Sequence, residues 1–385
     1  MMRHSYFGAL FVSVTLLAPS PATAQAPDAK PDLGANAAMK YWKAFGLLPT
    51  LDKDQQKLLE DCNKVPLDAA ALKLIDNSSM SRLYLHRGAK LQRCDWGLEL
   101  DDGLRLVLPH IPKAATLARL AVLNARHEFD KGHGKAGWED VMAVLTLARH
   151  FEQDRLMIIQ MLGYRIEETA LEAVAPYLPK LKQALPKSAA KLLDALPARP
   201  TLAQMLLAEK QVGPVWLIQE LKDADQRSKG SWRDVLKELF DHPESEDRDL
   251  AKSIKSVEEA VKMLEDVLPF YDQMAKLTAL PRKEAEGKYP ELLKKALAAN
   301  PMAHAVFPAL DRVIAAEHRI QARTALFRAA LTVVQDGPDK LKDIKDPFGD
   351  GPFEYKALDK GFELKSKLRF KGQPVTLTVG QGKKQ

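Results

Sequence analysis

The sequence predicts a mainly α-helical fold of stacked antiparallel helical hairpins, followed by a small C-terminal antiparallel β meander. Apolar residues recur every three or four positions over most of the chain up to residue 335, which is the period of an amphipathic helix. Short polar stretches separate these segments, and consecutive helices joined by short turns pack antiparallel. From Asp336 onward the apolar period changes to two, which is the period of a β-strand.

Helix starts and stops are visible at the beginning of this series. A first helix is predicted from Ala37 and is stopped by Pro49, because proline cannot continue a helix. Asp52 and Asp68 belong to the residue types that cap helix N-termini, so each predicts the start of a short helix.

Longer helices are predicted next. Gly163 and Ala170 lie on the apolar stripe of one of them, which indicates a close approach to a neighbouring helix. Pro214 should kink a later one. The predicted segments cover residues 114–129, 138–148, 156–174, 202–221, about 246–280 and 302–334.

The C-terminal strands have the clearest pattern in the chain. The run "G-F-E-L-K-S-K-L-R-F", residues 361–370, alternates apolar and charged side chains without interruption. Shorter alternating runs around Tyr355 and Leu377 flank it, with turn-forming residues between them. We therefore expect a three-stranded meander with one apolar face against the helices and a basic outer face.

The first residues predict a secretory signal peptide. Arg3 and His4 precede an apolar stretch over residues 7–18, which is shorter than the roughly 20 residues that a membrane-spanning helix needs. Small residues before Gln25 predict cleavage between Ala24 and Gln25. No later stretch is long and apolar enough to cross a membrane. We therefore expect a periplasmic or secreted protein without a transmembrane segment after signal removal.

The chain is expected to divide at a proline-rich stretch near residue 180. The predicted parts are a signal peptide (1–24), an N-terminal helical domain (25–180), a second helical region with long helices (181–335), and the β meander with a basic tail (336–385).

Net charge argues against a nucleic-acid partner. The formal net charge is +6, and six cations after Glu363 account for all of it. The rest of the chain is close to neutral, so the basic pI reflects the tail and predicts no DNA-reading surface.

Cys62 and Cys94 are the only cysteines. In an oxidising compartment they could form a disulfide, which typically contributes about 2–4 kcal/mol. Two separate buried thiols explain the sequence equally well, so both alternatives stay open. Two cysteines alone cannot complete a structural zinc site.

Motifs for cofactors and metals are incomplete. Gly132 to Gly137 spells a dinucleotide-binding fingerprint, but that motif must follow a strand and here a helix is predicted before it. His127 and His133 do not have the four-residue spacing of a zinc-binding helix. The sequence therefore predicts neither a cofactor nor a metal.

The run "R-C-D-W-G-L-E-L-D-D-G-L-R-L-V-L-P-H" gathers the chemically notable side chains. Its carboxylates lack the order of an EF-hand calcium loop, and sequence cannot show two of them facing each other as glycoside hydrolysis requires. A structural turn is the favoured interpretation, and a binding or catalytic site is the alternative. The binding candidates are Asp95, Trp96, Glu99, Asp101, Asp102 and His110, and no catalytic residue is predicted.

Two resemblances add expectations. The run "R-C-D-W-G-L-E-L-D-D-G", with "N-A-A-M-K-Y-W-K-A-F" before it and "L-T-L-A-R-H-F-E-Q-D-R-L" after it, resembles a family of uncharacterised, exported, mostly helical bacterial proteins. That resemblance implies export and a helical fold but no activity. The helix pair around "A-R-L-A-V-L-N-A-R" and "W-E-D-V-M-A-V-L-T-L-A-R" is also similar to tetratricopeptide-type hairpins.

A third resemblance concerns the C-terminal part. "D-P-F-G-D-G-P-F-E-Y-K", residues 346–356, is similar to the C-terminal turn and strand of the major pseudopilins of type II secretion. The N-terminal pattern of pseudopilins is missing, so the resemblance implies a β cap on a long helix and not filament assembly.

These patterns lead to one functional expectation and two alternatives. We expect an exported helical scaffold or binding protein that recognises a protein partner through a concave helical surface. The alternatives are a periplasmic hydrolase whose carboxylates converge only in the fold, and an accessory of an envelope or secretion assembly.

Overall fold

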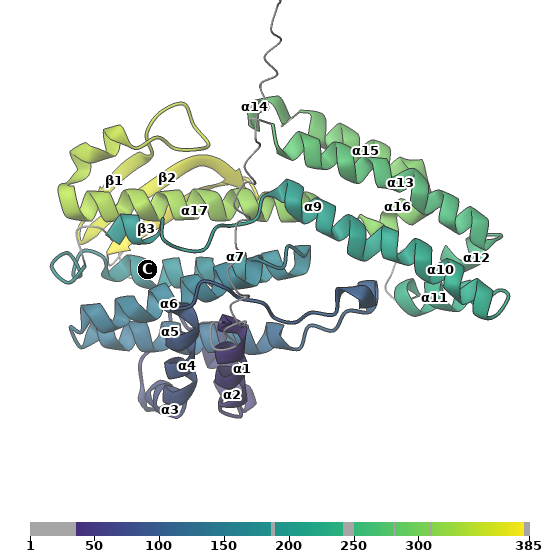
Figure 1. The fold of residues 1–385 in the computed structure, drawn as a ribbon. Coiled ribbons are helices and arrows are strands. Elements are labelled where there is room, and N and C mark those ends of the chain that lie inside the picture. The colour runs from purple at the N-terminus through teal and green to yellow at the C-terminus, as the bar shows by residue number, and fades with distance from the viewer. Residues whose placement is uncertain are drawn as a thin grey trace, which may run out of the picture. The chain divides into compact units, whose positions relative to one another are not determined.

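The computed structural model describes residues 36–185, 189–241, 250–280, 282–285, 287–307 and 310–380 (Figure 1). The predicted signal peptide with its cleavage site at Ala24 and Gln25, and the end of the basic tail after Gly380, lie outside these residues. The chain from Ala35 onward forms one compact unit. It is mainly helical and ends in a three-stranded antiparallel sheet, as the sequence predicts.

The first helices confirm the predicted starts. The Asp52 carboxylate accepts a hydrogen bond from the Gln55 N–H, and the Gln55 side chain accepts one from the Asp52 N–H. The Asp68 carboxylate caps the following helix through one hydrogen bond, which it accepts from the Ala71 N–H. The elements of this part are α1 (Ala37–Gly46), α2 (Lys53–Glu60), α3 (Ala69–Asn77), α4 (Ser79–Ala89), the 3₁₀ helix η1 (Leu100–Arg105), α5 (His110–Asp130), α6 (Gly134–Glu152) and α7 (Met157–Val174).

The next part differs from prediction at three points. The helix expected over 246–280 is interrupted before Ser256, whose side chain caps a new helix. The helix expected over 302–334 is also divided, because its first part ends at Val306 and Phe307 has non-helical φ and ψ of −113° and 51°. At Pro214, where a kink is predicted, the structure has a π-helical turn. The elements are η2 (Ala175–Tyr177), α8 (Ala189–Leu192), α9 (Leu202–Lys210), the π turn η3 (Gln211–Val215), α10 (Trp216–Arg227), α11 (Trp232–Phe240), α12 (Leu250–Ser253), α13 (Val257–Thr278), α14 (Arg282–Ala285), α15 (Lys288–Ala299), α16 (Pro301–Val306), α17 (Leu310–Asp336) and η4 (Pro338–Asp343).

The sheet confirms the predicted meander. Its strands are β1 (Glu354–Leu358), β2 (Gly361–Phe370) and β3 (Gln373–Gly380), in that spatial order. Leu364 of β2 lies opposite Leu377 of β3, and both are buried against the helices. The prediction of an apolar inner face is wrong for β1, because Tyr355 is 41% exposed.

Two large hydrophobic cores lie within the compact unit. The first contains side chains of α1 and α4 to α7 together with α17 and the sheet. The second is formed by α9 to α13, α15 and α16. Helix α17 crosses between α7 and the sheet, so the long C-terminal helix completes a core that the N-terminal helices begin (Figure 1).

A buried ionic cluster joins α6, α7 and the segment before α9. It consists of Arg149, Glu152, Glu167 and Arg199. The Arg199 guanidinium lies 2.8 Å from Glu152 and 2.6 Å from Glu167, and Arg149 lies 3.2 Å from Glu167. Both carboxylates are at most 1% exposed. Thr324 of α17 donates a hydrogen bond of 2.6 Å to Glu167, so the cluster also fixes α17.

Candidate functional site

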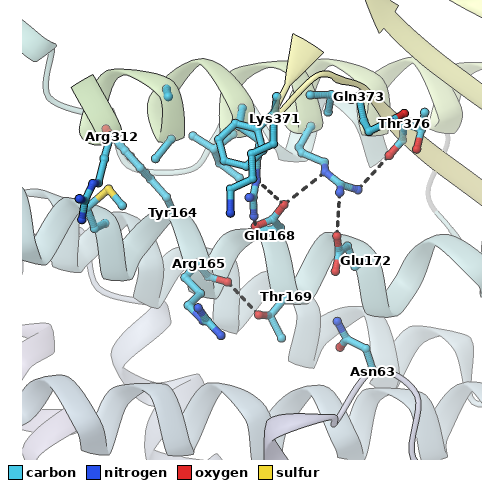
Figure 2. A pocket seen from close by; sticks show the side chains of 18 of the residues that line it. Asn63, Tyr164, Arg165, Glu168, Thr169, Glu172, Arg312, Lys371, Gln373 and Thr376 are labelled. Atoms are coloured by element: carbon cyan, nitrogen blue, oxygen red, sulfur yellow. Dashed lines mark hydrogen bonds and ion pairs between the residues drawn. The ribbon is translucent and has the colours of Figure 1, made fainter. Parts of the chain in front are cut away.

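A cavity of about 970 Å³ lies between α7, α17, the β2–β3 hairpin and the segment after α2 (Figure 2). We call it the basic cleft, because eight basic and five acidic side chains line it. The basic ones are Lys64, Arg119, Arg165, Arg312, Arg319, Arg323, Arg369 and Lys371, and the acidic ones are Glu60, Asp61, Glu168, Glu172 and Asp311.

Helical spacing places these side chains on facing surfaces. Arg165, Glu168 and Glu172 are three, four and seven positions apart on α7, so they lie on one side of that helix. Arg312 and Arg319 are two turns apart on α17 and face them. Both helices bury their other sides in the first core, which leaves the charges to line the cleft.

The hairpin closes the cleft from the side of the sheet. Lys371 and Gly372 both have positive φ, of 50° and 78°, as the tight two-residue hairpin turns of type I′ require. The turn brings Phe370 and Lys371 to the cleft wall, with the Lys371 ammonium 5.8 Å from the centre of the Phe370 ring.

Two arginines of α17 hold the acidic side chains of α7. Arg319 pairs with Glu168. Arg323 lies 3.3 Å from Glu168 and 2.9 Å from Glu172, and it donates a hydrogen bond of 2.9 Å to the carbonyl oxygen of Thr376 on β3. These ion pairs neutralise both carboxylates and tie α7, α17 and the sheet together (Figure 2).

Positive charge remains in the cleft after this pairing. Arg165 and Arg312 are exposed, and neither forms an ion pair with another described residue (Figure 2). Burial lowers the pKa of Arg319, and the positive charges of Arg323 and Arg165 lower it further. The eight basic side chains outnumber the five acidic ones among the described lining residues, an arrangement that an incoming anion would relieve.

The sequence-predicted run lies elsewhere, between the first core and α10. Asp95 forms a turn, because its carboxylate accepts a hydrogen bond from Gly97 and pairs with Arg93 at 3.0 Å. The Gly97 bond, and then Arg93, lower the pKa of Asp95. Asn36 exchanges two hydrogen bonds with the Asp95 backbone. Asp95 therefore anchors the run to the start of α1.

Trp96 and His110 come together in an aromatic cluster with Tyr41, His150 and Phe151. The centre of the Trp96 ring lies 5.0 Å from that of His110 and 4.5 Å from that of Phe151. His110 is fully buried, neither ring nitrogen has a hydrogen-bond partner among the described residues, and burial lowers its pKa to about 4. Because the surroundings of His110 are apolar, its imidazole stays neutral and serves as a packing side chain.

The remaining binding candidates lie apart from the aromatic cluster. Glu99 and Asp102 are exposed, and Asp101 lines a second cavity. Gly103 has φ +55° and packs directly against the Trp216 ring of α10. Arg105 pairs at 2.9 Å with Glu220 of α10 and with Glu238 of α11. Residues 93–110 thus form a contact between the first and the second hydrophobic core.

Both cysteines are buried free thiols in the structure. Burial raises the pKa of Cys62 to about 11 and raises that of Cys94 as well. Neither thiol is therefore activated as a nucleophile at neutral pH.

The described part of the chain has neither a cluster of metal ligands nor a membrane-spanning helix. Across residues 36–380, leaving out the gaps given above, no three His, Cys, Asp or Glu side chains are grouped to hold a metal ion. No helix within those ranges has both the length and the apolar character to span a bilayer.

Sequence reasoning missed the basic cleft. Its charges sit at positions that look like ordinary solvent-exposed helix faces, and the pairing partners Glu168 and Arg319 are 151 residues apart. The only signal in the sequence was the helical spacing of Arg312, Arg319 and Arg323 along one face.

Comparison with known proteins identifies no relative. No protein-family model, curated protein or solved structure matches the chain. The resemblances drawn from sequence runs therefore stay predictions.

Proposed function

We propose that the protein is an exported binding protein that receives an acidic segment of a partner protein in the basic cleft. The observation behind this proposal is the excess of cations, above all Arg165 and Arg312, which have no ion-pair partner among the described residues. Guanidinium groups bind carboxylates through paired hydrogen bonds, so arginines at a cleft mouth suit an acidic chain.

The shape of the cleft supports a chain-like ligand. Its cations come from α5, α7, α17, the β2–β3 hairpin and the segment after α2, so they surround a cavity of about 970 Å³. A single small anion would contact a minority of them, whereas an extended acidic segment can pair with several at once. Export is supported by the predicted signal peptide over residues 1–24.

The hydrolase alternative receives less support from the geometry. Glu168 and Glu172 are the carboxylates nearest the centre of the ion-pair network, and both are paired with arginine. The described residues that line the cavity include no histidine. An acid–base mechanism needs a carboxylate that is free to contact the substrate, whereas these two carboxylates are engaged by Arg319 and Arg323.

Charge reversal tests the proposal directly. A fluorescently labelled deca-glutamate peptide should bind the mature protein, more weakly as salt rises, and a deca-lysine peptide should not. Arg165→Glu combined with Arg312→Glu should weaken deca-glutamate binding by about tenfold or more. Fluorescence anisotropy measures both.

A matched control reverses two exposed lysines in the second core's helices, Lys276→Glu with Lys294→Glu, which changes net charge equally. Equal losses in the two double variants would show non-specific charge attraction and contradict the proposal. Protein recovered from the native envelope for this assay should begin at Gln25, and a full-length cytosolic product would contradict the export part.

A further inference from the structure

A second cavity has the opposite charge. We call it the acidic groove. It measures about 780 Å³ and lies where η1 and the α6–α7 turn meet α9, η3, α10 and α13. Its volume falls in the roughly 300–1,000 Å³ range of small-molecule pockets, which often form where two cores meet.

The wall of the groove is mostly apolar. The π turn at Pro214 widens the helical path between α9 and α10, and it presents Val212 and Val215 to the cavity. The apolar side chains that complete this wall are Leu100, Leu156, Ile218 and Leu268.

The polar part of the lining carries one sign of charge. Three carboxylates line the groove, those of Asp101, Asp154 and Glu265, and its described lining contains no lysine, arginine or histidine. Asp101 and Glu265 are exposed, whereas Asp154 lies deeper. A ligand that enters therefore meets a negative potential over an apolar floor.

Asp154 has an unused acceptor. Its Oδ2 atom is shielded from solvent and has no hydrogen-bond partner among the described residues. Burial and, to a smaller extent, the nearby Asp95 charge raise the pKa of Asp154 to about 7. A buried polar atom without a partner is uncommon in folded proteins. A hydrogen-bond donor on a ligand would satisfy it.

The backbone holds Asp154 in this place at some cost. The next residue, Arg155, is not a glycine and yet has φ 62°, in the left-handed region. Such a conformation is uncommon and often occurs near functional positions. The turn lies directly after Asp154 and places this residue in the lining of the groove.

We propose that the acidic groove binds a small apolar molecule with a primary amine at one end. The ammonium donates to the carboxylate of Asp154 and lies between the charges of Asp101 and Glu265. The hydrocarbon part packs on Val212, Val215 and Leu156. This site is independent of the basic cleft and of its proposed partner.

Three probes with the same hydrocarbon chain test the proposal by isothermal titration calorimetry: octylamine, octanol and octanoate. Octylamine should bind one site per chain, octanol should bind about tenfold or more weakly, and octanoate should not bind measurably. Equal affinities for octylamine and octanoate, or no binding of octylamine, would overturn the proposal.

Variants locate the site. Asp154→Asn should reduce octylamine affinity about tenfold and leave octanol binding unchanged. Asp101→Asn with Glu265→Gln changes only exposed carboxylates, so it keeps the test valid even where Asp154→Asn fails to fold. Asp359→Asn, in the remote β1–β2 turn, is the matched control and should bind octylamine like the native protein. Native-like affinity in the Asp101/Glu265 double variant and in Asp154→Asn would place the amine elsewhere and overturn the proposal.

Discussion

The last turn of α6 divides four consecutive side chains between two buried clusters. Arg149 and Glu152 enter the ionic cluster, while His150 and Phe151 enter the aromatic cluster. Both clusters are nearly inaccessible to solvent, but they are stabilised differently. The aromatic cluster depends on packing, and the ionic cluster depends on every charge keeping its partner.

This difference predicts unequal sensitivity to substitution. A ring in the aromatic cluster can be exchanged for another ring at a small cost, because the interactions are spread over many contacts. Removal of Arg199 from the ionic cluster leaves two buried carboxylates with Arg149 as their one remaining cation in the cluster, 3.2 Å from Glu167 and 4.0 Å from Glu152. The stability that a buried charge contributes therefore depends on its neighbours more strongly than the stability that a buried ring contributes.

The largest effect is expected at Arg199. Arg199→Met keeps an unbranched side chain but removes the guanidinium, so that Arg149 alone must compensate the buried Glu152 and Glu167. We expect the free energy of unfolding to fall by about 3–5 kcal/mol, measured by urea denaturation at neutral pH.

Arg93→Met is the control for that change, because it breaks an ion pair whose side chains are 69% and 54% exposed. It should alter the free energy of unfolding by less than about 1 kcal/mol. Similar losses in the two variants would mean that burial of the ionic cluster does not matter.

A smaller effect is expected where α7 approaches α6. A methyl group on Gly163 would lie 2.6 Å from Glu152 Cγ and 3.1 Å from the Ala148 carbonyl oxygen. Since Glu152 is held by Arg199, it cannot move aside freely. Gly163→Ala should lower the free energy of unfolding by about 1–3 kcal/mol, observed as a lower melting temperature.

Gly46→Ala is the matched control, since nothing lies within 4 Å of the added methyl group. Its stability should be unchanged or slightly raised. A stable Gly163→Ala variant would show that the helices can separate locally without loss.

The smallest effect concerns the pH dependence of the aromatic cluster. Burial lowers the pKa of His110 from 6.5 to about 4, so the unfolded chain takes up a proton at a pH where the native protein does not. Stability is therefore complete above the unfolded pKa and is lost as the pH falls from there toward 4. His110→Phe removes this proton uptake and keeps a ring in place.

The unfolding free energy of the native protein relative to His110→Phe should drop by about 1 kcal/mol between about pH 7 and about pH 5.5. Denaturant titrations at the two pH values measure the difference. Parallel pH profiles for the two proteins would exclude a neutral buried His110.

Local patterns explain what could be predicted from the sequence. The alternation in β2 and the caps at Asp52 and Asp68 depend on neighbouring residues, so they were recognisable without the fold. Gly163 was predicted to allow a close approach, and the structure places it against Glu152. The break before Ser256 was missed because a cap inside an apolar period is not distinctive.

Long-range contacts explain the rest. The basic cleft joins α7 to α17, and the acidic groove joins the α6–α7 turn to α9 and α13. Trp96 and His110 stand out by residue type, but only the fold shows that aromatic rings surround them. Asp101 and Asp154 are more than 50 residues apart and line one groove.

Gly103 limits how the molecule can vary. Its φ of +55° disfavours any other residue, and a methyl group there would fall within 1.9 Å of the Trp216 ring. Glycine at position 103 therefore sets how closely η1 can approach α10. Leu100 and Asp101 line the acidic groove and precede Gly103 in the same short segment. The shape of the groove therefore depends on a glycine, which has no side chain of its own.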